Sequence, residues 1–274
     1  MFALHFRLYA GLRKRGLPEV FSRVGASVSN CGETPRGRRR CVDMSTSVTP
    51  EPYRPRDFGS SLTDNDLNQL TNSFVDGPLA EAASLRRVSD REGADLVGRK
   101  LTARANYAGI IFPYFSPLDR SRPIEYRLRR DEPDLERKSD GSVRPKAKYL
   151  WPPGRPNRLY FPPLITQQHL SNLNVPVVVV EGEKKTLAMH RVATFDPELI
   201  SFVSLGVGGV WNWRGVIGKA HSANGSRTNV NGVIEDFDLV SWRGRKAYIL
   251  FDANVRQNSS VQGARRALAS ELGR

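Results

Sequence analysis

Residues 175–181 read VPVVVVE, and this segment constrains the fold more than any other part of the sequence. Four consecutive valines without polar alternation are typical of a strand that is buried on both faces, as in a parallel sheet covered by helices. The run ends at Glu181-Gly182, and residues 183–193 have the composition and spacing of a helix. We therefore predict a strand, a turn and a helix that belong to an α/β domain.

Two later segments extend this pattern. Residues 200–205 are predicted to form a strand that ends at Gly206, and residues 247–251 a strand that ends at Asp252. One face of a final helix is marked by Val261, Ala264, Leu268 and Leu272. These elements predict an α/β domain over residues 164–274, with a mainly parallel sheet and flanking helices.

The preceding region, residues 105–163, is predicted to be a small basic β-rich module. Residues 107–115 are a β-rich run, and residues 124–130 alternate apolar and charged side chains as a half-buried strand does. Short extended segments are expected at 148–151 and 158–161, with a polar loop at 131–146.

Short helices are expected further upstream, in residues 61–104. One follows the N-cap residue Thr63 and carries Leu67, Leu70 and Phe74, and a second covers residues 79–88. Residues 1–60 are expected to form a disordered basic and polar tail, within which Met44 is an alternative start.

The charge of the chain, +14 in total, is concentrated in two segments. Residues 99–158 hold fifteen basic and seven acidic residues, a net charge of +8, and residues 1–43 have a net charge of +6. Such a field attracts polyanions without specifying their sequence, although it also fits a solvated surface that has no partner. The basic residues expected to contact nucleic acid are Arg127, Arg129, Lys146, Lys148, Lys184 and Lys185.

Several other classes of protein are excluded. The two cysteines, Cys31 and Cys41, cannot build a disulfide framework or a zinc ribbon, so a reducing, cytoplasmic compartment is expected. No apolar run approaches the roughly 18 residues that cross a bilayer, and we expect no membrane partner. The glycine-rich segments at 206–211 and 215–220 match neither a dinucleotide fingerprint nor a P-loop. The four histidines show no metal-ligand spacing.

Candidate chemistry lies where two predicted strands end. Glu181 and Asp252 each follow an apolar strand, and the carboxyl ends of parallel strands meet at one edge of a sheet. Two carboxylates with the amide of Asn254 would offer Mg²⁺ the oxygen ligands that it prefers. The alternative is that these acids cap helices or form surface ion pairs.

The same residues resemble a known family. Residues 178–185 (VVVEGEKK) resemble the first motif of the Toprim family of primases and topoisomerases, and residues 249–254 (ILFDAN) resemble its Asp-x-Asp motif. Residues 204–206 resemble its second strand and glycine turn, and segments within residues 109–160 resemble the module that precedes Toprim in bacterial primases. Overall, residues 105–274 resemble a Toprim-like family (domain of unknown function 3854) carried by replication proteins of mobile elements.

This resemblance implies a Toprim-like sheet and a primase-like role in DNA replication. Glu181 would be the general acid/base of nucleotidyl transfer, Asp252 a Mg²⁺ ligand, and DNA or RNA and a replicative helicase the partners. Asn254 departs from the motif, because it replaces the second Asp and removes one negative charge from the metal site. The chain also stops after the last helix, where the family has a further strand, so we expect a truncated domain.

Three hypotheses remain open at this point. The first is a Mg²⁺-dependent enzyme of nucleotidyl transfer or phosphodiester chemistry, and the second is a nucleic-acid-binding module whose catalysis is weakened. The third is a metal-dependent phosphohydrolase of a small substrate, against which the broad basic block argues.

Overall fold

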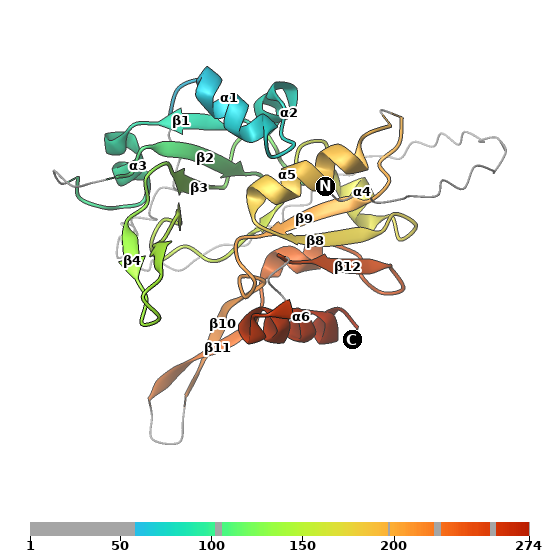
Figure 1. Ribbon diagram of the computed structural model, residues 1–274. Coiled ribbons are helices and arrows are strands. Elements are labelled where there is room, and N and C mark those ends of the chain that lie inside the picture. The colour runs from blue at the N-terminus through green and yellow to red at the C-terminus, as the bar shows by residue number, and fades with distance from the viewer. Residues whose placement is uncertain (1–57, 102–105, 197, 222–225, 253–255, 274) are drawn as a thin grey trace, which may run out of the picture. The chain divides into compact units, whose positions relative to one another are not determined.

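The computed structural model describes residues 58–101, 106–196, 198–221, 226–252 and 256–273 (Figure 1). In these residues the strands form two four-stranded sheets and two hairpins. The first sheet has the order β1-β2-β3-β6 and is antiparallel, and the second has the order β12-β8-β9-β7. The hairpins are β4–β5 and β10–β11, and the second projects away from the sheets (Figure 1).

The bounds of the elements are as follows. The first sheet contains β1 (Arg86–Val88), β2 (Gly109–Tyr114), β3 (Glu125–Arg130) and β6 (Tyr149–Leu150). The second contains β7 (Leu159–Tyr160), β8 (Val177–Glu181), β9 (Val203–Val207) and β12 (Ala247–Leu250). The hairpins are β4 (Leu135–Arg137) with β5 (Val143–Pro145) and β10 (Arg214–His221) with β11 (Arg227–Val233). The helices are α1 (Asp64–Thr71), α2 (Gly77–Ala82), α3 (Asp90–Leu96), α4 (Gln167–Ser171), α5 (Glu183–Ala193), η1 (Glu235–Leu239) and α6 (Ser259–Leu272).

The second sheet is built around the valine run. Strand β8 pairs in parallel with both β9 and β12, and β7 joins β9 as an antiparallel edge strand. Val177 and Val179 pack in one core with residues of α6, so by strand alternation Val178 and Val180 face the side of α5. Figure 1 shows these two helices on opposite sides of the sheet. The expectation of an α/β fold with parallel strands and flanking helices is confirmed.

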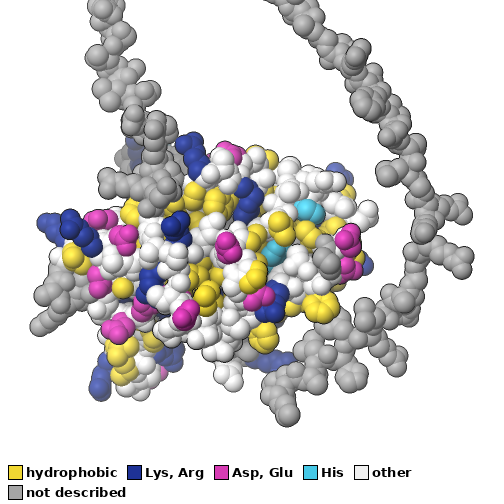
Figure 2. Space-filling model, turned by 90° about the horizontal axis from the view of Figure 1, so that it is seen from above, with side chains coloured by type: hydrophobic (Ala, Val, Ile, Leu, Met, Phe, Trp, Pro, Cys, Tyr) yellow, Lys and Arg dark blue, Asp and Glu magenta, His cyan; other side chains and the backbone are white. Residues whose placement is uncertain are grey.

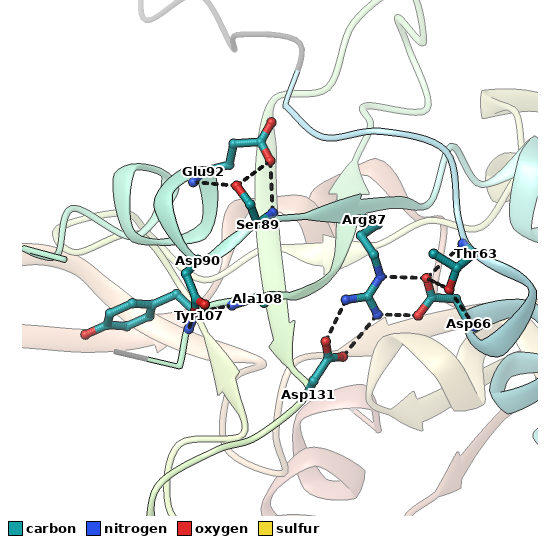
Figure 3. Close-up of polar contacts among 9 residues, drawn as sticks. All are labelled: Thr63, Asp66, Arg87, Ser89, Asp90, Glu92, Tyr107, Ala108 and Asp131. Atoms are coloured by element: carbon teal, nitrogen blue, oxygen red, sulfur yellow. Dashed lines mark hydrogen bonds and ion pairs between the residues drawn. The ribbon is translucent and has the colours of Figure 1, made fainter. Parts of the chain in front are cut away.

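The first sheet is anchored to the N-terminal helices by polar contacts (Figure 3). Arg87 of β1 reaches Asp66 of α1 on one side and Asp131 on the other. Asp66 also completes a capping box with Thr63, whose side chain accepts a hydrogen bond from the Asp66 amide at 3.2 Å. These contacts hold the first helix against the edge of the sheet.

Phe58 and Ser60 also pack on this sheet, although the sequence places them in the tail. Phe58 lies edge-on to Tyr126, and Ser60 exchanges backbone hydrogen bonds with Arg87. Residues 1–57 of the expected tail, with Cys31 and Cys41, lie outside the described residues.

The structure corrects several local expectations. The predicted helix at 79–88 ends at Ala82, because Ser84 has a φ of 54° that a helix does not accept, and residues 86–88 form β1 instead. Phe74, expected on the apolar side of α1, lies beyond its end and is 71% exposed.

Other corrections concern segments that were expected to be irregular or were misplaced. The polar loop at 131–146 contains the β4–β5 hairpin, and α4 and the β10–β11 hairpin were not anticipated. The strand expected at 200–205 lies at Val203–Val207. Among the described residues, no helix has both the length and the apolar character needed to cross a bilayer.

Candidate functional site

Two carboxylates lie at the carboxyl edge of the second sheet. Glu181 is the last residue of β8, and Asp252 follows β12, which runs parallel to β8 in register Leu250 to Val180. The Asp252 backbone lies close enough to the Glu181 carboxylate to act on its pKa. Burial and the neighbouring Asp252 carboxylate raise the pKa of Glu181 above its ordinary value, against the lowering effect of Lys185 and Arg127. Two like charges therefore meet at this edge.

Lys185 partly neutralises these two carboxylates. Its ammonium group forms an ion pair with Asp252, and both side chains are about half exposed. A cation is thus already held where two carboxylates approach each other. Among the described residues, no group of three or more His, Cys, Asp or Glu side chains could hold a metal ion, and Asn254 lies outside those residues. The two carboxylates fit one Mg²⁺ ion only if Lys185 gives way and if other ligands are water or phosphate oxygens.

Gly182 makes the turn from this edge into α5. Its φ of 86° lies in the left-handed region that favours glycine, and it places no side-chain cap on the helix. The first turn of α5 therefore has backbone N–H groups without a side-chain cap, at the positive end of the helix dipole. Lys184 and Lys185 lie in this same turn, where a cation is electrostatically unfavourable unless an anion is bound.

Three basic side chains gather beside this turn: Arg129 of β3, Lys148 just before β6, and Lys184 of α5. Burial and Arg129 lower the pKa of Lys148. Burial, Arg129, Lys148 and Lys185 together lower the pKa of Lys184. None of the three forms an ion pair with an acidic side chain in the part of the chain that the structure describes. We call Arg129, Lys148 and Lys184 the cationic cluster.

Arg127 does not belong to this cluster, although the sequence placed it with Arg129 on one charged face. Its guanidinium donates to Glu183 Oε1 at 2.7 Å, and its side chain is only 12% exposed. The Tyr114 hydroxyl donates to the same oxygen. Burial and the Glu183 carboxylate raise the pKa of Tyr114 well above its ordinary value. Arg127 is therefore a neutralised, largely buried cation.

Sequence reasoning missed Glu183, because an acid in the first turn of a helix is ordinarily a solvated dipole partner. Here it is 1% exposed, and its partner Arg127 lies 56 positions away. Its second oxygen, Oε2, is buried without a hydrogen-bond partner among the described residues. The only sequence signal was the alternation of β3, which brings Arg127 to one face of the first sheet.

Other arginines of the basic block are also held in ion pairs. Arg130, Arg155 and Arg158 form ion pairs with Asp134, Glu125 and Asp236. Lys146 is exposed beside Glu136 of the β4–β5 hairpin and does not belong to the cationic cluster. On the face seen in Figure 2, basic and acidic side chains are interspersed. The arginines in these ion pairs are therefore less available to a polyanion than the cations of the cluster.

Comparison with known proteins gives one match. No curated protein and no solved structure matches the chain significantly. The strands and helices that carry Glu181, Lys184, Lys185 and Asp252 fall within residues 166–274, and this segment matches the family described as Domain of unknown function (DUF3854).

Proposed function

We propose that this protein binds nucleic acid and carries out Mg²⁺-dependent phosphodiester or nucleotidyl-transfer chemistry at the edge formed by Glu181 and Asp252. The observation that carries the proposal is that two mutually repelling carboxylates lie near a group of cations without acidic partners among the described residues. Two carboxylates repel each other at the end of β8, and Lys185, which pairs with one of them, adjoins the cationic cluster through Lys184. A phosphate ester with a divalent cation would complement both.

Each group has a distinct part in this proposal. The cationic cluster and the uncapped first turn of α5 would bind phosphate oxygens. Glu181 and Asp252 would hold Mg²⁺, which would neutralise charge on the phosphate when bound. Glu181, whose pKa is raised, is suited to accept and return a proton near the reacting oxygen. The resemblance to the Toprim family supports the same roles and a primase-like place in the replication of a mobile element.

A second candidate is a binding module in which catalysis is weak. Two observations favour it: Lys185 already neutralises Asp252, and Asn254 stands where the Toprim motif has a second Asp. In that case the cationic cluster would bind nucleic acid, but the carboxylates would retain little affinity for Mg²⁺.

Metal-titrated primer synthesis and strand cleavage test the proposal. We expect activity that requires Mg²⁺ and is lost in Glu181→Gln and Asp252→Asn, whereas the exposed acid of η1 gives a matched control, Asp238→Asn, with full activity. Nucleic-acid binding in EDTA should persist in all three variants. Binding without any Mg²⁺-dependent activity would select the binding module, and the absence of both would refute the proposal.

A further inference from the structure

A cavity of about 210 Å³ lies beside the cationic cluster, between the two sheets. It is lined by Tyr114, Arg127, Tyr149, Trp151, Asn157, Arg158, Gly208 and Asn212. The first four come from or adjoin the first sheet, and Gly208 directly follows β9 of the second. The volume exceeds the roughly 150 Å³ of a cavity that accepts a benzene ring but is below the roughly 300 Å³ of a typical drug-sized site. A cavity of this volume suits a ligand group with one ring system.

The charges of this cavity are already balanced. Arg127 is paired with Glu183, and Arg158 donates to Asp236 at 2.9 Å. A phosphate group would therefore gain little here, in contrast to the neighbouring cationic cluster. A purely apolar ligand is also unsuited, because two arginines and two asparagines contribute to the lining.

The lining has instead the chemistry that recognises a nucleobase. Tyr149 and Trp151 offer aromatic surface, and the Arg127 guanidinium lies 5.0 Å from the centre of the Tyr149 ring, a planar cation above a π-face. Asn157 is fixed by donating through Nδ2 to the Arg214 carbonyl at 2.7 Å, which leaves its carbonyl oxygen as an acceptor. The Asn212 amide lies at the same cavity without a side-chain hydrogen bond within the described residues.

Tyr149 connects the cavity to the cationic cluster. Its ring lines the cavity; burial and Glu183 raise the pKa of its hydroxyl, and Arg129 of the cluster lies close enough to oppose this shift. Lys148 is its neighbour in sequence. The cavity therefore adjoins the cationic cluster through Tyr149 and Arg129, and the cations of this cluster have no acidic partner among the described residues. This is the arrangement that a nucleotide requires, with the base in a neutral pocket and the phosphate on a positive surface.

We infer that this cavity binds the base of an unpaired nucleotide, either in a single strand or in a free nucleotide. The inference rests on the proposed function, because it specifies the substrate of the same site: a base must leave its duplex to enter a cavity of this size. A second cavity of about 640 Å³ shares Asn157 and Arg158 with the first and runs along β10, which provides space for the next nucleotides of a strand.

Gly208 gives a way to close the pocket. A Cβ atom on this residue would lie 2.3 Å from Nη1 of Arg127, so alanine would displace the guanidinium that lines the cavity. The next residue is a matched control, because a Cβ on Gly209 would lie 3.6 Å from Asn212, an ordinary contact distance. Gly208→Ala and Gly209→Ala thus add the same methyl group at adjacent positions with different effects on the pocket.

The experiment compares a short oligothymidylate with an abasic oligonucleotide of the same length, by fluorescence anisotropy in EDTA. The wild type and Gly209→Ala are expected to bind the oligothymidylate about five- to a hundredfold more tightly than the abasic strand. Gly208→Ala should lose most of this ratio while its affinity for the abasic strand stays unchanged. Asn212→Ala, which removes one amide from the lining, should reduce the ratio partially and serves as a second variant if Gly208→Ala fails to fold.

Equal affinity of the wild type for the two oligonucleotides would overturn the inference, and it would leave phosphate binding and Mg²⁺-dependent activity untouched. Competition distinguishes the two sources of the base. If thymidine monophosphate displaces the oligonucleotide better than deoxyribose 5-phosphate does, the pocket accepts free nucleotides. If only oligonucleotides compete, the pocket serves a strand.

Discussion

Arg87 and Arg129 lie on strands of the same antiparallel sheet, yet their surroundings are opposite. Arg87 donates to Asp66 at 2.6 Å and to Asp131 at 2.6 Å, so both ends of its guanidinium face carboxylates (Figure 3). Arg129 has no carboxylate partner among the described residues, its Nε is buried without a hydrogen bond, and it lies beside Lys148 and Lys184.

This difference separates cations that hold the fold from cations that are available to a ligand. A paired, half-buried arginine contributes to stability, since its loss strands a buried carboxylate. A group of like charges without counter-charge is a cost to the folded protein, and such groups are typical of functional sites. The comparison predicts that substitution of Arg87 lowers stability, whereas substitutions in the cationic cluster weaken nucleic-acid binding.

The largest expected effect is the loss of stability in Arg87→Met. The Asp66 side chain is only 1% exposed, so removing its partner leaves a buried charge and should cost about 3 kcal/mol of unfolding free energy. Chemical denaturation measures this loss. Arg86→Met, the exposed neighbour on the same strand, should change stability by less than about 0.5 kcal/mol.

The pH dependence of the Arg87→Met effect sharpens this prediction. Although burial opposes it, hydrogen bonds from Arg87 and Thr63 hold the pKa of Asp66 below its ordinary value of 3.8. A carboxyl group whose pKa is lower in the folded protein than in the unfolded chain stabilises the fold at pH values above the unfolded pKa. This stabilisation is lost as the pH falls through the pKa of the folded protein. The gap between wild type and Arg87→Met should therefore narrow below about pH 4. A gap that is constant with pH would show that packing, and not the ion pair, is lost.

The next effect is on binding. The triple variant Arg129→Gln, Lys148→Gln, Lys184→Gln should bind single-stranded DNA about 30-fold more weakly and lower the slope of log K against log[salt] by about 2. Its fold should stay intact. A triple variant of the β4–β5 hairpin, Arg137→Gln, Lys138→Gln, Arg144→Gln, removes the same number of charges and should have a much smaller effect. If the two triple variants weaken binding equally, net charge alone attracts the ligand and the cationic cluster has no special role.

The sequence predicted the second sheet better than strand β1 and the β4–β5 hairpin because these depend on different information. The valine run, the strand-end turns and the face formed by Val261, Ala264 and Leu268 are local patterns, and each was found in the structure. The short strands β1, β4 and β5 are stabilised by pairing with distant strands or by their own turn, which composition does not reveal. The edge strand β7 illustrates the limit: an extended segment at 158–161 was predicted within the basic module, but Leu159 and Tyr160 pair with β9 of the second sheet.

The candidate site was predictable in its position but not in its charge balance. Glu181 and Asp252 were expected at one edge, because the carboxyl ends of parallel strands meet there. Which basic residues are neutralised depends on tertiary partners such as Glu183 for Arg127 and Asp236 for Arg158. No periodicity encodes those pairs, so the sequence grouped Arg127 with Arg129 although their environments differ.

Lys185 is intermediate between the two classes of cation, because its partner Asp252 is itself a candidate metal ligand. We expect Lys185→Met to increase the affinity for Mg²⁺, since it removes a competing charge. At a Mg²⁺ concentration ten times the Kd, the ion should add about 1.4 kcal/mol to the unfolding free energy. Thermal unfolding with and without Mg²⁺ measures this gain, which should be absent in Glu181→Gln.

Acidification should weaken the stabilisation that Mg²⁺ gives. Because the pKa of Glu181 is raised, its carboxylate takes up a proton at a higher pH than an ordinary glutamate does, and a protonated carboxyl group competes with the metal. The Mg²⁺-dependent stabilisation should therefore decline on acidification before the ordinary value of 4.5 is reached. A gain that persists in Glu181→Gln would place the metal elsewhere.

The smallest effect concerns the cost of the cationic cluster itself. Lys184 is positively charged beside Arg129, Lys148 and Lys185, so Lys184→Met should raise the unfolding free energy by about 0.5 to 1 kcal/mol at neutral pH while it weakens nucleic-acid binding. The lowered pKa of Lys184 means that the unfolded chain holds this proton more tightly than the folded protein does. Wild-type stability should therefore rise relative to the variant as the pH approaches the ordinary lysine value of 10.5, and the difference should shrink. Lys246→Met, at an exposed lysine before β12, should show neither the gain nor its pH dependence. A loss of stability in Lys184→Met at neutral pH would show that Lys184 belongs with Arg87 among the cations that hold the fold.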